Sequence, residues 1–188
     1  MFLARHGETE WSQNGRHTGR TDLPLLPVGE ARAGSLGQRL QGIPFDAAFS
    51  SPLRRARDTA RLAGFPGAVL TDLLREWDYG DYEGLTSVQI HETVPSWDLW
   101  ADGCPGGETP TEVIARARRF LDQLPAAATR VIAFSHGHFI RAIALAFLGL
   151  PAAAGARLAL DTAALSVLRA GDRGGVVQLW NDVGHLPV

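Results

Sequence analysis

Lysine is absent from this chain of 188 residues, so all positive side-chain charge apart from histidine is carried by arginine. Cys104 is the only cysteine, which excludes an internal disulfide and a zinc cluster built from cysteines. The formal net charge is -2, and neither a basic surplus nor an acidic tail is present. We therefore expect no nucleic-acid partner.

Apolar runs are short as well, and none reaches the roughly 20 residues that a membrane-spanning helix needs. No basic region followed by a long apolar core opens the sequence, so we expect no signal peptide, no membrane partner and a cytoplasmic location. The balance of 45% hydrophobic and 20% charged residues is typical of a globular protein. The length predicts a single domain over 1–188.

Strands and helices are predicted to alternate through most of the chain. The predicted strands cover 1–5, 45–50, 68–74, 130–134, 164–169 and 176–180, with a hairpin connection at 171–175. The predicted helices cover 27–40, 52–63, a short segment after a capping box at Thr86, 110 to about 124 after a second capping box at Thr109, and 139–148. Irregular segments at 12–26 and 95–107 separate them. This order predicts an α/β fold, a three-layer α/β/α sandwich with a mainly parallel six-stranded sheet.

The first predicted strand runs directly into Arg5, His6 and Gly7. Arg5 offers a fork of donors that suits a phosphate, and His6 is a nitrogen nucleophile that can be neutral near pH 7. Gly7 lets the backbone turn sharply and approach a ligand closely. A strand that ends in a cation, a nucleophile and a glycine indicates phosphoryl chemistry, although taken alone it also fits a surface turn.

Arginines crowd the first turns of the helix predicted after the second strand, where Ser51 is expected to be the N-cap and Pro52 the first helical residue. Arg54, Arg55 and Arg57 lie where the free N–H groups and the helix dipole already favour an anion. An ordinary surface helix places arginine near its C-terminal end instead. The cluster therefore indicates that an anion binds there.

The carboxyl ends of the parallel strands are expected to meet at one edge of the sheet, which is where ligands bind in such folds. Four strand ends carry polar groups: Arg5-His6-Gly7, Ser51-Pro52 with Arg55, Glu76, and His136-Gly137. Two histidines, two arginines and a carboxylate therefore converge at one edge.

These residue types match the needs of phosphoryl transfer, in which the phosphoryl oxygens are held, a nucleophile attacks in line and the leaving oxygen is protonated. Arg5 and Arg55 are expected to hold the oxygens, with His136 as a further donor in its imidazolium form. His6 is expected to attack phosphorus. Glu76 is expected to protonate the leaving alkoxide and then to deprotonate the water that hydrolyses the phosphoenzyme. Taken alone, Glu76 also fits a salt bridge to a neighbouring arginine, and His136 a structural histidine at a turn.

Arg-His-Gly-Glu-Thr at 5–9 resembles the signature of the histidine phosphatase superfamily, the phosphoglycerate-mutase-like proteins. The resemblance continues through Gly-Arg-Thr-Asp-Leu-Pro-Leu at 19–25, Ser-Pro-Leu-Arg-Arg-Ala at 51–56 and His-Gly-His at 136–138, and spans essentially the whole chain. It implies a phosphohistidine at His6, a phosphate pocket of Arg5, Arg55 and His136, and a proton donor at Glu76. The stretches 74–84 and 100–109 resemble the branch that holds acid phosphatases and sedoheptulose-bisphosphatase.

The substrate side of the site is predicted to include Ser12, His17, Thr18, Gly19, Arg20, Tyr82 and Gly137, together with the segment 97–104. Ser12 stands where many members of the family have an asparagine that contacts phosphate. Its hydroxyl can donate one hydrogen bond, and Asn14 is the alternative. Aromatic groups with few charges suit varied or sugar-like phosphate esters.

Hydrolysis is preferred over phosphoglycerate mutase activity. Cofactor-dependent mutases resemble this chain but carry a longer insertion with additional basic residues, whereas the segment 78–102 is short and contains no arginine or lysine. The sequence therefore predicts a phosphomonoester hydrolase that acts on small phosphorylated metabolites without a metal or other cofactor, and the mutase is the alternative.

Two further alternatives stay open. A metal-dependent hydrolase could use His17, His136 and His138 as ligands, but two arginines at the same edge would repel a cation. A phospho-ligand-binding module without turnover would be expected to have lost the nucleophile, the acid or the second histidine, and none of these is lost. The sequence allows either a monomer or a homodimer.

Overall fold

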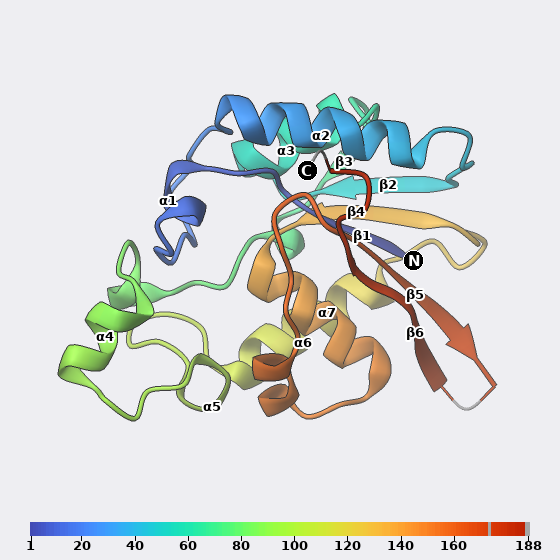
Figure 1. Cartoon of the computed structure of the whole chain (residues 1–188). Coiled ribbons are helices and arrows are strands. Elements are labelled where there is room, and N and C mark those ends of the chain that lie inside the picture. Colours follow the sequence, from blue (N-terminus) through green and yellow to red (C-terminus); the bar gives the residue numbers. More distant parts are fainter. Residues whose placement is uncertain (173, 187–188) are drawn as a thin grey trace.

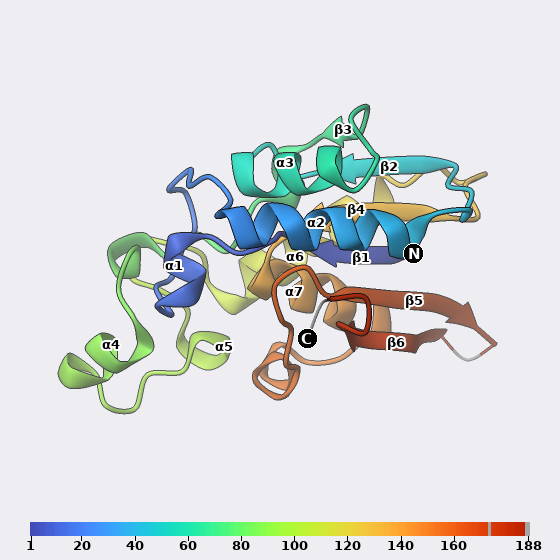
Figure 2. The same cartoon turned by 45° about the horizontal axis from the view of Figure 1, so that its top comes forward.

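The computed structural model describes residues 1–172 and 174–186, which form an α/β fold around one six-stranded sheet (Figures 1 and 2). The strands are β1 (Phe2–Arg5), β2 (Ala47–Ser50), β3 (Val69–Leu70), β4 (Val131–Ser135), β5 (Leu165–Gly171) and β6 (Gly174–Asp182). Their order across the sheet is β3-β2-β4-β1-β5-β6.

The sheet is mixed rather than mainly parallel, so this part of the prediction is wrong. β3, β2, β4 and β1 pair in parallel, whereas β5 is antiparallel to both β1 and β6. Parallel neighbours need a long crossover connection, but β5 and β6 are joined by a hairpin in which Gly171 pairs with Gly174. The predicted connection at 171–175 is thus a hairpin, and residue 173 within it lies outside the described residues.

Helices lie on both faces of the sheet. The helices are α1 (Glu10–Gln13), α2 (Pro27–Leu40), α3 (Arg54–Leu62), α4 (Ser87–Thr93), α5 (Leu99–Asp102), α6 (Pro110–Asp122) and α7 (Gly137–Leu148). Figures 1 and 2 show α2 and α3 on one face and α6 and α7 on the other. Within the described residues, no helix combines the length and the apolar character needed to cross a bilayer.

β4 is buried along its whole length and joins the two apolar clusters of the core. Ile132 and Phe134 belong to the cluster that includes Leu36 of α2, and Ala133 belongs to the cluster that includes Phe139 of α7. Successive residues of a strand point to opposite faces, so one short apolar run serves both faces. This central strand ends directly before His136.

The helix starts predicted at Pro27 and after the two capping boxes are confirmed, whereas the helix predicted from 139 begins at Gly137. Thr86 and Thr109 each form a capping box at the start of α4 and α6. The helix predicted from Pro52 begins at Arg54 instead, with Leu53 as its N-cap. The Ser51 hydroxyl accepts from the backbone N–H of Leu53 at 3.3 Å and also pairs with a side chain at the sheet edge, described below.

Two irregular stretches differ from the prediction. The strand expected over 68–74 is limited to β3, because Thr71 accepts a hydrogen bond from the backbone N–H of Leu73 and caps a 3-10 helix at Asp72–Leu74. The segments expected to be irregular contain the short helices α1 and α5, which Thr9 and Asp98 cap.

Gly7 and Gly29 allow α2 to pack backbone against backbone on the segment that follows β1. A Cβ at Gly29 would lie 2.4 Å from the carbonyl oxygen of Glu8, and a Cβ at Gly7 would lie 2.4 Å from the carbonyl oxygen of Gly29. Both distances are far inside van der Waals contact, so only glycine fits at either position. The backbone N–H of Leu26 also donates to the carbonyl oxygen of Glu8 at 2.9 Å. This contact fixes the segment that carries His6.

We expect Gly29→Ala to lower the free energy of unfolding by about 1–3 kcal/mol, because the added methyl group forces the two backbones apart. Gly34→Ala is the matched control, since it lies in the same helix and a Cβ there meets nothing within 4 Å. The control should be neutral or more stable by up to about 1 kcal/mol, as alanine favours a helix interior. Chemical denaturation of both variants measures the difference, and equal stability of the two would contradict the packing argument.

Candidate active site

Three parallel strand ends bring the predicted residues to one edge of the sheet. The backbone N–H of His6 donates to the carbonyl oxygen of Ser135 at 3.0 Å, and that of Ser51 donates to the carbonyl oxygen of Phe134 at 3.0 Å. His136 follows Ser135 directly. The ring centroids of His6 and His136 are consequently 5.2 Å apart, in an edge-to-face arrangement.

His6 is buried, and its tautomer is fixed by one contact. Its Nδ1 lies 2.7 Å from the carbonyl oxygen of Gly7. A carbonyl oxygen only accepts hydrogen bonds, so Nδ1 carries the proton and Nε2 is left with a free lone pair. Burial, together with the positive charges of Arg55 and Arg5, holds the pKa of His6 well below its ordinary value. The ring is therefore a neutral imidazole with a nucleophilic nitrogen.

Arg5 carries a hydrogen-bond donor that the described residues leave unused. Its Nη1 donates to the carbonyl oxygen of Leu160 at 2.5 Å, while its buried Nε has no partner among them. Gly137, the first residue of α7, packs directly on this guanidinium, since a Cβ there would lie 3.3 Å from both Nε and Cζ. A half-buried cation whose buried Nε–H is unused, beside a helix N-terminus, is suited to bind an anion.

His136 is neutral in this structure, so the expectation that it is an imidazolium is wrong. Nε of Arg55 donates to Nδ1 of His136 at 3.0 Å, and Nε2 of His136 pairs with the Ser51 hydroxyl at 2.8 Å. A guanidinium only donates, so Nδ1 carries no proton and Nε2 does. Burial, followed by the charge of Arg55, holds the pKa of His136 well below its ordinary value.

Arg55 is fully buried and holds the loop that precedes α2. Its Nη1 donates to the carbonyl oxygen of Thr21 at 2.8 Å, and its Nη2 donates to those of Thr18 and Gly19 at 2.9 and 3.2 Å. These contacts, with the bond to His136, leave one of its N–H groups unassigned among the described residues. The predicted loop residues are thus tied to the sheet edge through one side chain.

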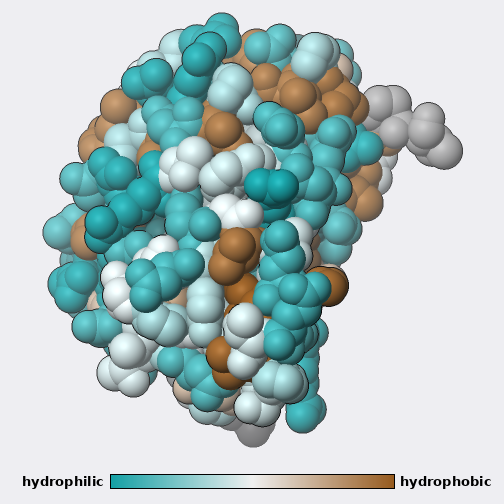
Figure 3. Space-filling model, turned by 90° about the vertical axis from the view of Figure 1, so that its left-hand side faces the viewer, coloured by the Kyte–Doolittle hydropathy of each residue, from teal (hydrophilic) through white to brown (hydrophobic). Residues whose placement is uncertain are grey.

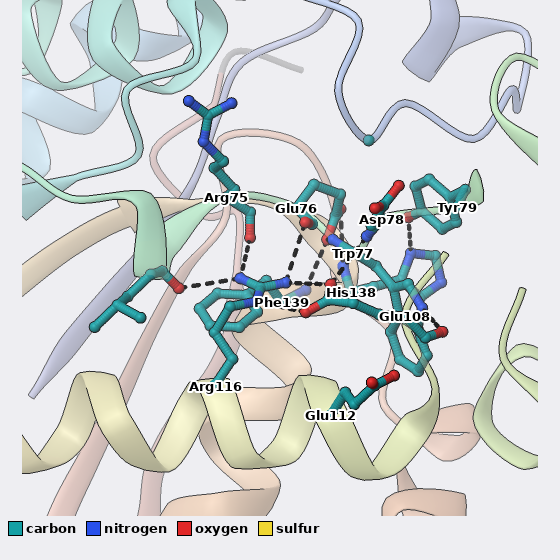
Figure 4. A network of polar contacts seen from close by, with 12 residues as sticks. Arg75, Glu76, Trp77, Asp78, Tyr79, Glu108, Glu112, Arg116, His138 and Phe139 are labelled. Carbon is teal, nitrogen blue, oxygen red and sulfur yellow. Dashed lines mark hydrogen bonds and ion pairs between the residues drawn. The ribbon is translucent and has the colours of Figure 1, made fainter. Parts of the chain in front are cut away.

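Glu76 follows the 3-10 helix at 72–74, and its carboxylate points at the first turn of α7 (Figure 4). Oε1 accepts hydrogen bonds from the backbone N–H groups of Trp77 (2.9 Å) and Phe139 (2.8 Å), and Oε2 accepts one from that of His138 (3.1 Å). Two of these groups are donors that a helix start leaves unsatisfied. Arg75, the neighbour considered for a salt bridge, pairs with Asp72 instead. Oε2 thus keeps one lone pair for a proton.

His6 and Glu76 line the same cavity, which has a volume of about 200 Å³. The remaining lining residues come from the segment after β1, the start of α4 and two aromatic side chains: Trp11, Ser12, Gly15, Arg16, His17, Thr18, Tyr79, Ser87 and His138. The predicted Ser12, His17 and Thr18 are among them. Figure 3 faces the side of the molecule that carries α1, α4 and α5, and most of that surface is hydrophilic.

The other predicted substrate residues lie elsewhere. Gly19 and Arg20 line a second cavity of about 230 Å³, which shares Glu76 with the first, and Arg20 forms an ion pair with Asp78 at 2.5 Å. Tyr82 lines neither cavity and packs edge-on against Trp97, with 5.3 Å between ring centroids.

The hydroxyl of Ser12 both accepts and donates a hydrogen bond within its own turn of the chain. It accepts from the backbone N–H of Thr9 at 2.9 Å and donates to the carbonyl oxygen of Thr9 at 3.0 Å, which completes the capping box of α1. Ser12 therefore lies at the cavity while its side chain stabilises the helix that follows the His6 segment.

The family comparison agrees with this geometry. The family model described as the histidine phosphatase superfamily (branch 1) matches residues 1–183. This chain belongs to that superfamily.

Several relatives of this histidine phosphatase are phosphatases by name. An acid phosphatase of Mycobacterium tuberculosis is 44% identical over 171 residues, covering 89% of this chain and 84% of that protein. Sedoheptulose 1,7-bisphosphatase of Saccharomyces cerevisiae is 36% identical over 182 residues, covering 79% and 67%. A 2,3-bisphosphoglycerate-dependent phosphoglycerate mutase 2 of Gloeobacter violaceus is 36% identical over 159 residues, covering 76% and 73%.

A solved structure of an open reading frame product from Mycobacterium tuberculosis superimposes with a TM-score of 0.91 at 40% identity. The match covers 98% of this histidine phosphatase and 97% of the solved chain. The fold is therefore shared with a protein whose structure has been solved.

The sequence analysis missed the place of Tyr79 and His138 in the site of this histidine phosphatase. The Tyr79 hydroxyl lies 2.7 Å from Nδ1 of His138, and His17 packs edge-on against Tyr79 with ring centroids 4.7 Å apart. The sequence signal was the aromatic, glycine-containing stretch directly after Glu76, whose residues must lie close to the acid. The second histidine of His-Gly-His was considered only as a metal ligand.

Three histidines of this phosphatase, the buried His6 and His136 and the half-buried His138, have pKa values well below the ordinary value, with desolvation as the largest cause and nearby arginine charges adding to it. In the unfolded chain each of these histidines has a pKa near 6.5. At about pH 6.5 and below, the unfolded state therefore binds protons that the native state does not bind. Stability is therefore fully present above that pH and falls as the pH falls.

We expect the free energy of unfolding to decrease between about pH 7 and pH 5, by at most about 1.4 kcal/mol per pH unit for each of these histidines. Asp46 and Glu112, whose pKa values are lowered by hydrogen bonds, contribute in the same direction only at more acidic pH. Urea unfolding across this range measures the slope, and His138→Gln should make it shallower. A free energy that does not change over this interval would show that the native histidines titrate normally.

Proposed function

We propose that this chain is a metal-independent phosphomonoester hydrolase that acts on small phosphorylated metabolites through a phosphohistidine at His6. The observation that carries the proposal is the free Nε2 lone pair of a buried, neutral His6 in one cavity with Glu76, beside Arg5. The acid phosphatase and sedoheptulose-bisphosphatase relatives support the hydrolytic activity.

In the first half-reaction, Nε2 of His6 attacks phosphorus as the bond from phosphorus to the ester oxygen breaks. The leaving oxygen takes the electron pair of that bond and receives a proton from Glu76. The unused Nε–H of Arg5 holds a phosphoryl oxygen, and the unassigned N–H of Arg55 provides a second donor. His136 joins them by exchanging its bond to Ser51 for one to the phosphoryl group.

In the second half-reaction, Glu76 is a carboxylate and accepts a proton from water while the water oxygen attacks phosphorus. The bond between phosphorus and Nε2 breaks, which returns the lone pair to His6 and releases inorganic phosphate. No step needs a metal, because the positive charge that stabilises the phosphoryl oxygens comes from Arg5 and Arg55. Two buried guanidinium groups also disfavour a cation at this position.

The substrate is proposed to be a small phosphate ester whose leaving group faces His17, Thr18 and Tyr79. We propose that Ser12 lines the same side of the cavity. Gly19 and Arg20 are proposed to act on the substrate indirectly, through the loop that precedes α2, and Gly137 through α7. Three points stay predictions: a cytoplasmic location, a single domain over 1–188, and a monomer or homodimer. The helix pairs on the two faces of the sheet support the three-layer α/β/α sandwich.

Phosphoglycerate mutase activity is the second candidate, since mutases are among the relatives. The short connection from Asp78 to Asp102 carries α4, α5 and a 3-10 helix at Gly80–Tyr82, and it has no arginine or lysine to hold a carboxylated substrate in two orientations. Hydrolysis is therefore favoured. Release of inorganic phosphate from phosphoglycerate, rather than interconversion of its isomers, distinguishes the two activities.

We expect His6→Ala to lower the hydrolysis of para-nitrophenyl phosphate by at least about 10³-fold, because the nucleophile is lost. His91→Ala is the control, since His91 is exposed and lies outside the cavity. The native enzyme should keep its activity in a chelator. Activity that survives in His6→Ala, or that disappears with the chelator, would overturn the proposal.

A further inference from the structure

Arg116 is a buried arginine of α6 that none of the proposed chemistry uses. Its five N–H donors are all engaged, and every acceptor lies in two segments of the chain around Glu76 and Glu108. Nε and Nη2 donate to the two carboxylate oxygens of Glu108, each at 2.7 Å. Nη1 donates to the carbonyl oxygens of Leu73 (3.0 Å) and Arg75 (2.7 Å), and Nη2 donates to that of Glu76 (3.1 Å).

The segment that carries Glu76 depends on these contacts because residues 75–79 form no helix or strand. Arg116 binds three carbonyl oxygens of residues 73–76, two of them in this segment and one in the 3-10 helix directly before it. Glu108 binds the next residues, as its Oε2 accepts from the backbone N–H of Asp78 at 3.0 Å and its own backbone pairs with Asp78 and with the Trp77 ring. The Arg116–Glu108 pair therefore spans the segment on both sides of the acid.

Arg116 also reaches the other side of the Glu76 carboxylate. Its guanidinium carbon lies 3.9 Å from the centre of the Phe139 ring, and the backbone N–H of Phe139 donates to Oε1 of Glu76 at 2.8 Å (Figure 4). One planar cation thus contacts both the backbone of the acid and the helix turn that binds its side chain. An ammonium group could not make these contacts, because it has three donors and no planar face.

We propose that Arg116, held by Glu108, is the positioning residue for Glu76. The proposal rests on the proposed function, in which Glu76 delivers a proton to the leaving oxygen. Loss of this geometry slows the steps in which Glu76 moves a proton and leaves attack by His6 on a good leaving group nearly unchanged. A residue that served only the stability of the fold would affect all substrates alike.

The experiment compares two aryl phosphates in Arg116→Lys. Phenyl phosphate releases a phenolate with a high proton affinity, like the tyrosine side chain with its pKa near 10, so its cleavage needs the acid. Para-nitrophenyl phosphate releases an anion that leaves without a proton. The measured quantity is kcat/KM, which reports only the steps up to and including the first irreversible one. Hydrolysis of the phosphoenzyme comes later and does not affect it.

We expect Arg116→Lys to lower kcat/KM for phenyl phosphate by about 10²-fold and that for para-nitrophenyl phosphate by less than about 5-fold, in line with the usual size of general-acid catalysis. An equal loss for both substrates would overturn the proposal. Arg118→Lys is the matched control, because Arg118 lies on the exposed side of the same helix and makes no hydrogen bond among the described residues. It should leave the ratio of the two values unchanged.

Two further variants separate the possible failures. Glu108→Gln keeps the shape of the side chain and should shift the ratio in the same direction by a smaller factor, which tests the proposal if Arg116→Lys does not fold. Glu76→Gln should show the same selectivity at larger amplitude. If Glu76→Gln lowers both substrates equally, the acid is assigned wrongly and the proposed function fails; if only Glu76→Gln is selective, the positioning role alone fails.

Discussion

The burial of Arg5 and Arg55 beside His6 is the constraint on which the rest of the site depends. Removing a guanidinium from water costs several kcal/mol unless its donors are satisfied, and no carboxylate pairs with either group among the described residues. Arg55 is satisfied by backbone carbonyl oxygens and by His136, which orders the loop at 18–21. Arg5 is left with an unused donor. Burial, with the charge of Arg55 next, lowers the pKa of both histidines, so a cationic pocket holds the neutral imidazole that we propose as the nucleophile.

The proposed acid, Glu76, is held by different means from the proposed nucleophile, His6. His6 follows a strand and is fixed by ladder neighbours, whereas Glu76 lies in a segment without regular structure. Three backbone N–H groups hold its carboxylate, and Arg116 with Glu108 holds its backbone. His6 and Glu76 line one cavity but are held in place by separate contacts. They also mean that the acid can be disturbed while the nucleophile and the phosphate pocket stay intact.

The strand ends could be predicted from the sequence because the rules that govern them are local. Short apolar runs followed by polar residues predicted β1, β2 and β4 and placed Arg5, His6 and His136 at one edge. The bond between the Ser51 hydroxyl and His136 could not be predicted, because the two residues are 85 positions apart in the chain. The neutral state of His136 depends on the same kind of distant contact with Arg55. The hairpin of β5 and β6 was predicted, but not that it makes the sheet mixed. His138 and Arg116 reach Glu76 only through the fold, whereas Tyr79 follows Glu76 in the chain and could have been named from the sequence.

The measurement that tests the account most directly is the trapping of the phosphoenzyme. The native protein is mixed with radiolabelled para-nitrophenyl phosphate, quenched in base within milliseconds, and digested for peptide mapping. The account predicts up to about one phosphoryl group per chain, on the peptide that contains His6, stable in base and lost in acid as expected for a bond between phosphorus and an imidazole nitrogen. Turnover without any such adduct, or an adduct on another residue, would contradict it.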